Sequence, residues 1–399
     1  MPKTVTRFPI QRTLPFDPPA EISDLREHDS IAQVELFDGK LAWLITRFDD
    51  VAAVCTNPAF SSDTTKDGYP EVFQGRTRKE DKEKSLISMD PPDHDNLRRM
   101  LTMWFTVKRA EEMRPRIQAR VDGLIDDMLA KDGPVDLVQD FALPIPTSVI
   151  CWLLGVPEED HLFFQERSAT RLGLATPGKD VASATTELLA YLDDLVTKKI
   201  DNPADDILSD LVHNHMLTGN LDRVTLVDLG RQLLIAGHET TANMITLATM
   251  LLLEHPDQSE DLRAHPELFP TAVEEVLRYL TIAQTLVGRV ATRDVTIGQQ
   301  IIRAGEGVRA LLYAANRDPR VFPEPDRLDI RRGNVRRHMA FGFGIHQCLG
   351  QAYARVEMHV ALQTLFRRLP NLAMAVPLDE VNFKYESSVH GVHSLPITF

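Results

Sequence analysis

Cysteine is the residue that this sequence lacks most clearly: Cys55, Cys151 and Cys348 are its three cysteines in 399 residues. So small and odd a number provides no disulfide framework, and it fits a reducing compartment, so we expect a cytoplasmic protein. Long apolar runs are missing too. No segment approaches the roughly 20 apolar residues of a membrane span, and the opening MPKTVTRFPI lacks the apolar stretch of a secretory signal. We therefore expect no contact with a membrane.

Basic charge is also in short supply. Asp and Glu number 58 against 44 Lys and Arg, which gives a net charge of -14. A general nucleic-acid binder usually carries a basic excess, so we expect no nucleic-acid partner. Low-complexity tracts and internal repeats are absent as well. Although the length alone would allow two or three domains, the sequence predicts a single domain over residues 1–399, as a monomer.

Apolar periodicity predicts a mainly helical fold with a smaller β portion. The longest helical pattern covers 222–255, and at about 1.5 Å per residue it would measure about 50 Å. Because most of its faces are apolar, such a helix has to pass through the centre of the fold. Alternating residues around Asp38-Gly39 predict a β-hairpin, and short strand signals follow within 287–308. Further helices are predicted over 20–28, 109–129, 141–154, 158–172, 180–200, 268–280 and from just after Cys348 to 368.

Cys348 stands between a glycine-rich turn and a predicted helix start, in the stretch FGFGIHQCLG from Phe341 to Gly350. Glycines let the backbone approach a flat ligand, and a helix N-terminus favours a thiolate over a thiol. A lone cysteine at this place could also be a small apolar residue or a nucleophile. The ten-residue spacing is more specific, because it resembles the cytochrome P450 signature Phe-x-x-Gly-x-His/Arg-x-Cys-x-Gly with every defining position filled.

This resemblance covers nearly the whole chain. It implies the cytochrome P450 fold, with a long central helix over a buried haem, and Cys348 as the thiolate ligand of the iron of haem b. Within the loop, it implies haem contacts for Phe341, Gly342, His346 and Gly350. The chain looks most similar to actinobacterial enzymes of secondary metabolism in the family's bacterial branch. It also resembles the fungal nitric oxide reductases of that branch.

Further cationic positions match the family's donors to the haem propionates. His94 and Arg98 are spaced one helical turn apart, and Arg289 lies in the strand-like stretch VGRV. His94 and Arg98 could also be plain surface residues. The resemblance implies that these three residues and His346 hold the propionates, and the planar fork of arginine suits a carboxylate.

The hexapeptide AGHETT at 236–241 lies midway along the longest predicted helix. A carboxylate and a hydroxyl inside an apolar helix cost free energy, and Gly237 weakens the helix further. The stretch resembles the family's Ala-Gly-x-Glu/Asp-Thr-Thr/Ser. That resemblance implies that Ala236 and Gly237 lie against the haem, with Gly237 opening a groove for dioxygen. It also implies that Thr240 hydrogen-bonds oxygen and water, and that Glu239 relays protons.

Glu275 and Arg278 are three residues apart and share one face of a predicted helix. Such pairs are common on solvated helices. This pair matches the family's Glu-x-x-Arg motif, at the usual distance before the cysteine loop. The resemblance implies a structural role, with Arg327 of the irregular segment as the third partner.

The leading functional prediction is a monooxygenase that hydroxylates or epoxidises a bulky, mostly apolar small molecule with dioxygen. The chain has no flavin domain, nicotinamide fingerprint or iron–sulfur cysteine set, so we expect electrons from a ferredoxin and a ferredoxin reductase. Basic residues near the cysteine loop are expected to attract an acidic ferredoxin: Arg99, Lys108, Arg109, Arg336, Arg337 and Arg355. The implied pocket wall is mostly apolar: Leu233, Ala236, Ile282, Leu286, Val287, Val389 and His390.

Two other functions remain open. Nitric oxide reduction with electrons directly from NADH is one, because cationic residues of the charged segment could meet a dinucleotide: Arg76, Arg78, Lys79, Lys82 and Lys84. Against it, these residues alternate with Glu80, Asp81 and Glu83, and Glu239 supplies an acid that such a reductase is expected to lack. The other is a haem sensor or carrier without catalysis, which would leave Glu239 and Thr240 without a task.

Overall fold

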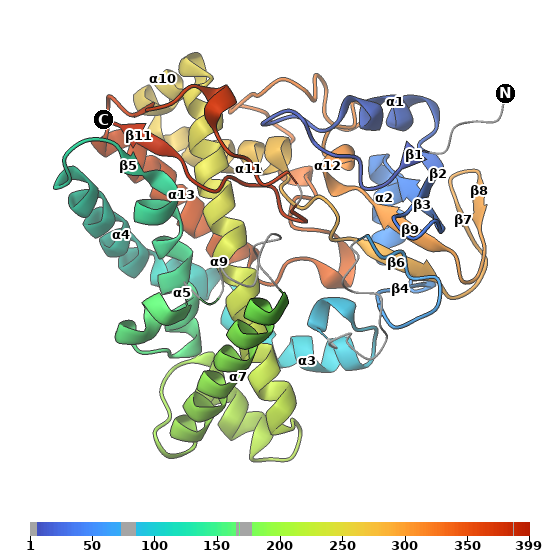
Figure 1. Cartoon of the computed structure of the whole chain (residues 1–399), viewed down its shortest axis with the longest axis horizontal. Helices are drawn as coiled ribbons and strands as arrows, with labels where there is room; N and C mark the ends of the chain where they lie inside the picture. Colours follow the sequence, from blue (N-terminus) through green and yellow to red (C-terminus); the bar gives the residue numbers. More distant parts are fainter. Residues whose placement is uncertain (1–5, 73–84, 165–166, 168–177, 386) are drawn as a thin grey trace. The chain divides into compact units, whose positions relative to one another are not determined.

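The computed structural model describes residues 6–72, 85–164, 167, 178–385 and 387–399 (Figure 1). The chain forms two compact units whose segments alternate along the sequence. The strand-rich unit comprises Met1–Asp95, Glu267–Leu349 and Phe383–Gly391. The helical unit comprises Asn96–Pro266, Gly350–Asn382 and Val392–Phe399. The cationic residues predicted to meet a dinucleotide, at 76–84, lie outside the described residues.

A sheet organises the strand-rich unit. Its described strands, in spatial order, are β1 (Thr6–Arg7), β2 (Ile31–Glu35), β3 (Leu41–Ile45), β9 (Gly307–Ala310), β6 (Gly288–Ala291) and β4 (Phe60–Ser61). The predicted hairpin is confirmed, because β2 and β3 pair antiparallel and Gly39 adopts a φ of 80° in the turn. β3 and β9 are parallel, whereas β6 runs antiparallel to both β9 and β4.

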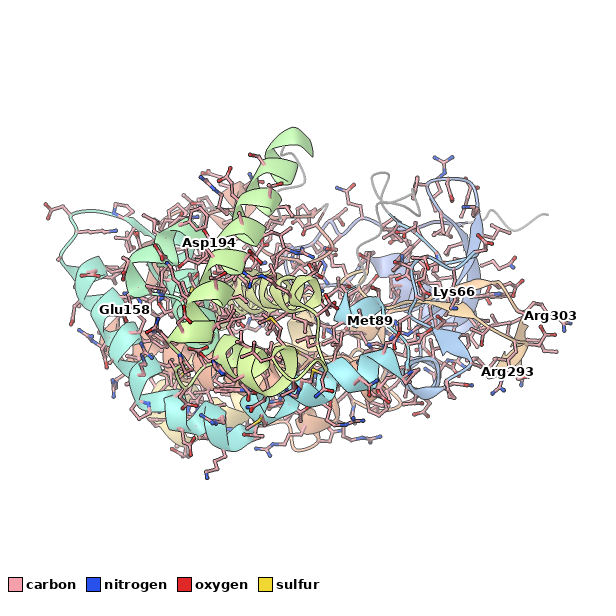
Figure 2. All side chains as sticks on the ribbon, turned by 90° about the horizontal axis from the view of Figure 1, so that it is seen from below. Lys66, Met89, Glu158, Asp194, Arg293 and Arg303 are labelled. Atoms are coloured by element: carbon pink, nitrogen blue, oxygen red, sulfur yellow. The ribbon has the colours of Figure 1, made fainter. Side chains whose placement is uncertain are left out.

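Helices and a small hairpin complete this unit. The helices are α1 (Ala20–His28), α2 (Phe48–Thr56), α11 (Phe269–Leu280) and α12 (Leu312–Ala315). An apolar core lies between α2 and the sheet, where Phe48, Val308 and Phe322 are buried together. The hairpin of β7 (Val295–Ile297) and β8 (Gln300–Ile302) is flanked by two exposed arginines, Arg293 before β7 and Arg303 after β8 (Figure 2).

The helical unit is organised around α9 (Arg223–Leu253), which is 31 residues long and packs against α5 (Pro144–Leu154), α7 (Gly178–Asp201) and α13 (Gln351–Arg368). The Asp222 side chain caps its start by accepting from the Thr225 backbone N–H at 2.8 Å. Residues 241–252 are all buried, so the prediction of a long, internal helix is confirmed within this unit.

The other helices of the unit are α4 (Val107–Leu129), α8 (Ile207–Asp210) and α10 (Pro256–Ala264), and α3 (Asp93–Thr102) crosses the boundary between the units. A second sheet has the order β10 (Ala373–Met374), β11 (Pro396–Thr398) and β5 (Val135–Asp136). The mainly helical fold class is therefore confirmed. Helix α5 begins at Pro144, three residues later than predicted, because a wider π-type turn covers Val138–Ala142. Among the described residues, no helix combines the length and apolarity that crossing a membrane would need.

Candidate haem site

The loop before Cys348 owes its shape to two glycines. Gly342 and Gly344 have φ values of 76° and 74°, which other residues rarely adopt. A Cβ on Gly344 would also lie 2.5 Å from the backbone oxygen of Cys55 in α2. The turn closes where the Cys348 backbone N–H donates to the Phe341 oxygen at 2.7 Å. Both glycines are therefore needed to fold this loop.

Cys348 itself has an exposed side chain, and α13 follows with Gly350 as its N-cap residue. The predicted order of glycine-rich turn, cysteine and helix start is therefore present. Phe341 and Gly342 are half-buried on the same loop. This arrangement presents the sulfur beside a helix N-terminus, which favours the thiolate that a haem iron needs.

Two of the predicted propionate donors face each other in the strand-rich unit. The rings of His94 and His346 lie 4.3 Å apart. His346 Nε2 lies 2.9 Å from the Ser62 hydroxyl, and His94 Nδ1 lies 2.9 Å from the Asp95 carboxylate. His94 is 1% exposed, and its Nε2 has no hydrogen-bond partner among the described residues. Arg98 is half-buried one turn later on α3.

Arg289, on β6, is a buried cation. The residue is only 5% exposed, and its guanidinium donates to the Gly288 backbone oxygen at 2.7 Å. Burial lowers its pKa, and the neighbouring Cys55, Tyr69 and Asp90 only partly oppose that effect. Among the residues that the structure describes, no carboxylate forms an ion pair with it. A buried cation and the open Nε2 of His94 suit an anionic ligand, so this donor set fits the propionates of a haem.

The predicted oxygen-activation residues form one face of α9. Leu233, Ala236, Gly237 and Thr240 follow helical spacing and keep some exposure, whereas His238 is buried. Glu239 is half-buried beside Thr240. The Thr240 hydroxyl donates to the Ala236 backbone oxygen at 2.8 Å. Thr240 therefore places a hydroxyl on this partly exposed face, and Glu239 is the residue before it in the helix.

Gly237 also has a packing reason to be glycine. A Cβ at this position would lie 3.2 Å from Ile150 Cγ1 of α5. The absent side chain lets α5 and α9 approach each other closely.

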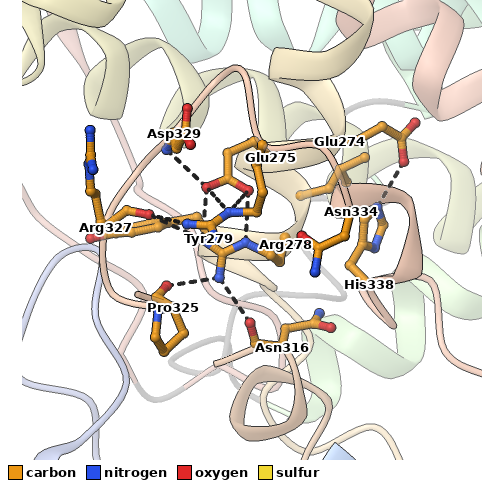
Figure 3. A network of polar contacts seen from close by, with 12 residues as sticks. Glu274, Glu275, Arg278, Tyr279, Asn316, Pro325, Arg327, Asp329, Asn334 and His338 are labelled. Carbon is orange, nitrogen blue, oxygen red and sulfur yellow. Dashed lines mark hydrogen bonds and ion pairs between the residues drawn. The ribbon is translucent and has the colours of Figure 1, made fainter. Parts of the chain in front are cut away.

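The Glu275–Arg278 pair lies at the centre of a buried polar network (Figure 3). Both side chains have 0% exposure, and Arg278 donates Nε and Nη2 to the two Glu275 oxygens at 2.8 Å each. Arg278 Nη1 also donates to the backbone oxygens of Asn316 and Pro325 at 2.9 and 2.8 Å. The pair thus ties α11 to the irregular segment, which agrees with a structural role.

The structure corrects the third partner of this pair. Arg332 Nε lies 3.1 Å from both Glu275 oxygens, and the Arg332 side chain is 8% exposed. The side chain of Arg327 is instead 65% exposed and lies 3.6 Å from Glu324. Arg327 contributes only its backbone oxygen, which accepts from Arg332 at 2.8 Å. The sequence offered no means of choosing, because the irregular segment contains several arginines without periodic spacing.

Two of the predicted substrate segments of the strand-rich unit, at 282–283 and 389–390, pair with each other. Val389 forms an isolated bridge with Ala283, and the His390 backbone N–H donates to the Ile282 oxygen at 2.8 Å. Leu286 is 40% exposed and Val287 half-buried on the segment that follows.

The placement of His390 in a pocket wall is not supported. Its side chain has 0% exposure, stacks on Phe383 and Tyr385, and contacts the Pro15 backbone oxygen through Nε2 at 2.7 Å. Burial, with a smaller effect of Arg12, lowers its pKa to about 3. His390 is therefore a neutral packing residue.

The basic residues expected to attract a ferredoxin differ in their surroundings. Arg99, Arg336 and Arg337 are exposed. Arg109 instead pairs with Asp205 at 3.1 Å and lies 4.6 Å over the Trp104 ring. Arg109 is therefore largely engaged within its own unit.

Known proteins resemble this chain over nearly its whole length. A family model described as Cytochrome P450 matches residues 174–396. Cytochrome P450-SU2 of Streptomyces griseolus is 49% identical over 385 residues, covering 96% of this chain and 94% of that protein. Pentalenic acid synthase of Streptomyces avermitilis is 47% identical over 393 residues, covering 98% and 97%. The crystal structure of GfsF superposes with a TM-score of 0.94 at 44% identity, covering 99% of this chain and 100% of that one.

Proposed function

This chain belongs to the cytochrome P450 family and is a cytochrome P450 monooxygenase, and from that premise we propose that residues 1–399 form one catalytic domain that binds haem b and hydroxylates or epoxidises a bulky, mostly apolar molecule. The observation that carries the proposal is the cysteine loop, in which two positive-φ glycines and the Cys348–Phe341 hydrogen bond present the sulfur beside a helix start.

The haem-binding residues follow from the donor set. Cys348 would ligate the iron, and His94, Arg98, Arg289 and His346 would pair with the propionates. Residues with little or no side chain, together with Phe341, would lie against the ring: Ala236, Gly237, Gly342 and Gly350. When bound, a thiolate-ligated haem supplies the redox chemistry that activates dioxygen for insertion of one oxygen atom.

The residues of α9 would handle oxygen and protons. The Thr240 hydroxyl donates to Ala236 at rest, and rotation of its side chain would let it hydrogen-bond dioxygen or water instead. Glu239, half-buried beside it, would move protons from solvent towards that hydroxyl. Apolar side chains would hold the substrate and exclude water: Leu233, Ala236, Ile282, Leu286, Val287 and Val389.

A ferredoxin and its reductase would supply the electrons, because the sequence contains no flavin, nicotinamide or iron–sulfur signature of its own. We further propose that the enzyme is a cytoplasmic monomer. The three cysteines form no disulfide, which suits a reducing compartment.

Two assays test this function. A panel of steroids, terpenoids, macrolides and fatty acids should contain compounds that shift the Soret band, and a shifting compound should be oxidised when ferredoxin, reductase and reduced nicotinamide are all present. The second assay supplies nitric oxide and NADH without a protein donor. Rapid oxidation of NADH there, with no product from any compound, would replace the monooxygenase by a nitric oxide reductase.

A further inference from the structure

A chain of hydrogen bonds lies behind His346. His346 Nε2 contacts the Ser62 hydroxyl at 2.9 Å, and the backbone N–H of Ser62 donates to Asp90 Oδ1 at 2.7 Å. The second carboxylate oxygen of Asp90 accepts from the Ser61 hydroxyl. Ser61 and Ser62 are each 2% exposed. The contacts are therefore shielded from bulk water, which would otherwise compete for the ring nitrogen.

Asp90 connects the elements that carry the other donors. Its backbone oxygen accepts from the backbone N–H of His94 at 3.1 Å, at the start of α3. Its carboxylate holds the end of β4, and β4 pairs with β6, the strand that carries Arg289. One acidic side chain thus fixes a serine against His346 while its own backbone fixes His94. Loss of this carboxylate would loosen Ser62 and the end of β4, while the backbone contact to His94 would remain.

The direction of the Ser62 contact is tied to the tautomer of His346, because the serine hydroxyl can either donate to Nε2 or accept from it. A neutral imidazole has one N–H and one bare nitrogen. If the Ser62 hydroxyl donates to Nε2, the proton resides on Nδ1, which can then donate to a carboxylate. The reverse tautomer would present a lone pair to an anion and weaken its binding.

We propose that the Ser62 hydroxyl, held by Asp90, donates to His346 Nε2, so that Ser62 is a positioning residue that orients His346 as a donor to a haem propionate. The proposal rests on the proposed haem-binding function. Ser62 touches neither iron nor substrate in this account, and it acts only through His346. Its removal should weaken haem retention without changing the thiolate ligand.

The test measures haem release from the full-length holoprotein to excess apomyoglobin, followed by the Soret band. Ser62→Ala should release haem roughly three- to tenfold faster, the range expected for one lost hydrogen bond. Ser62→Thr, which keeps the hydroxyl, should stay close to the wild-type rate. Ser61→Ala is the matched control, because its equally buried hydroxyl contacts Asp90 and not the ring, so its release rate should change less than about twofold.

A double-mutant cycle separates positioning from a general packing effect. In a His346→Ala background, Ser62→Ala should change the release rate by less than about twofold, because the residue through which it acts is gone. The same acceleration in both backgrounds, or a wild-type rate for Ser62→Ala alone, would overturn the proposal. Circular dichroism checks that each variant is folded. A wild-type protein that binds no haem would refute the proposed function instead, since this inference presupposes a haem to retain.

Discussion

Replacement of Arg332 by alanine should destabilise the protein far more than replacement of Arg327. Arg332 Nε contacts both oxygens of the fully buried Glu275 at 3.1 Å. Its guanidinium also donates to the backbone oxygens of Pro323, Glu324 and Arg327 at 2.6, 3.1 and 2.8 Å. Breaking a buried ion pair costs about 3–5 kcal/mol, because the buried carboxylate loses one of its two arginines and three backbone oxygens lose their donor.

The matched change at Arg327 removes only an exposed contact. Its side chain is 65% exposed and lies 3.6 Å from Glu324, and such surface pairs contribute about 0–1 kcal/mol. Arg332→Lys should be intermediate, since an ammonium keeps the charge but cannot reproduce the planar fork.

Urea unfolding followed by far-ultraviolet circular dichroism measures these differences. With a slope of about 3–4 kcal/mol per molar urea for a chain of this size, Arg332→Ala should lower the midpoint by about 1 M. Arg327→Ala should lower it by no more than about 0.3 M. The opposite order of the two variants would restore Arg327 as the third partner and refute the assignment made from the network.

Three further changes test other parts of the account. Thr240→Ala should bind haem normally but release more peroxide per electron consumed. The reason is that the hydroxyl, which donates to Ala236 at rest, is no longer available for dioxygen. An unchanged yield of product per electron would show that Thr240 has no part in proton delivery. The lowered pKa of His390, about 3, means that the unfolded chain takes up its proton first as the pH falls below about 6.5. His390→Phe should therefore flatten part of the loss of stability between about pH 6 and pH 4, measured as urea midpoints, whereas parallel pH profiles would contradict the assigned cause. Arg337→Glu should slow ferredoxin-driven reduction of the haem, measured by stopped flow at low salt. The difference in rate from the wild type should fade at higher salt, as the Debye length falls below about 8 Å. A rate equal to that of the wild type at low salt would exclude Arg337 from the surface that binds the donor.

The elements that the sequence predicts well are those with strong local signals. Helix α9 has apolar residues on most faces, a capping Asp222 and a following Pro256, and its observed bounds differ from the prediction by one or two residues. The β2–β3 hairpin follows from Asp38-Gly39, which needs no distant partner. Local chemistry is enough in both places.

The parts that the sequence could not predict depend on distant contacts. Strand β4 is two residues long, too short for any alternation, so Ser62 gives no sign that it contacts a histidine 284 positions away. The irregular segment is held by hydrogen bonds from Arg278 to backbone oxygens, and no spacing rule distinguishes Arg332 from Arg327. Sequence also does not say which way a turn residue faces, so it cannot distinguish a pocket-wall His390 from the fully buried one observed.

The absorption spectrum of the reduced protein with carbon monoxide tests most directly whether Cys348 holds a haem iron through its thiolate. Wild-type protein should show the long-wavelength Soret band that distinguishes a thiolate-ligated haem from an imidazole-ligated one. Cys348→His should bind haem and lose that band, whereas Cys55→Ser, which changes a buried cysteine of α2, should keep it. A Cys348→His protein that still shows the thiolate band would contradict the account.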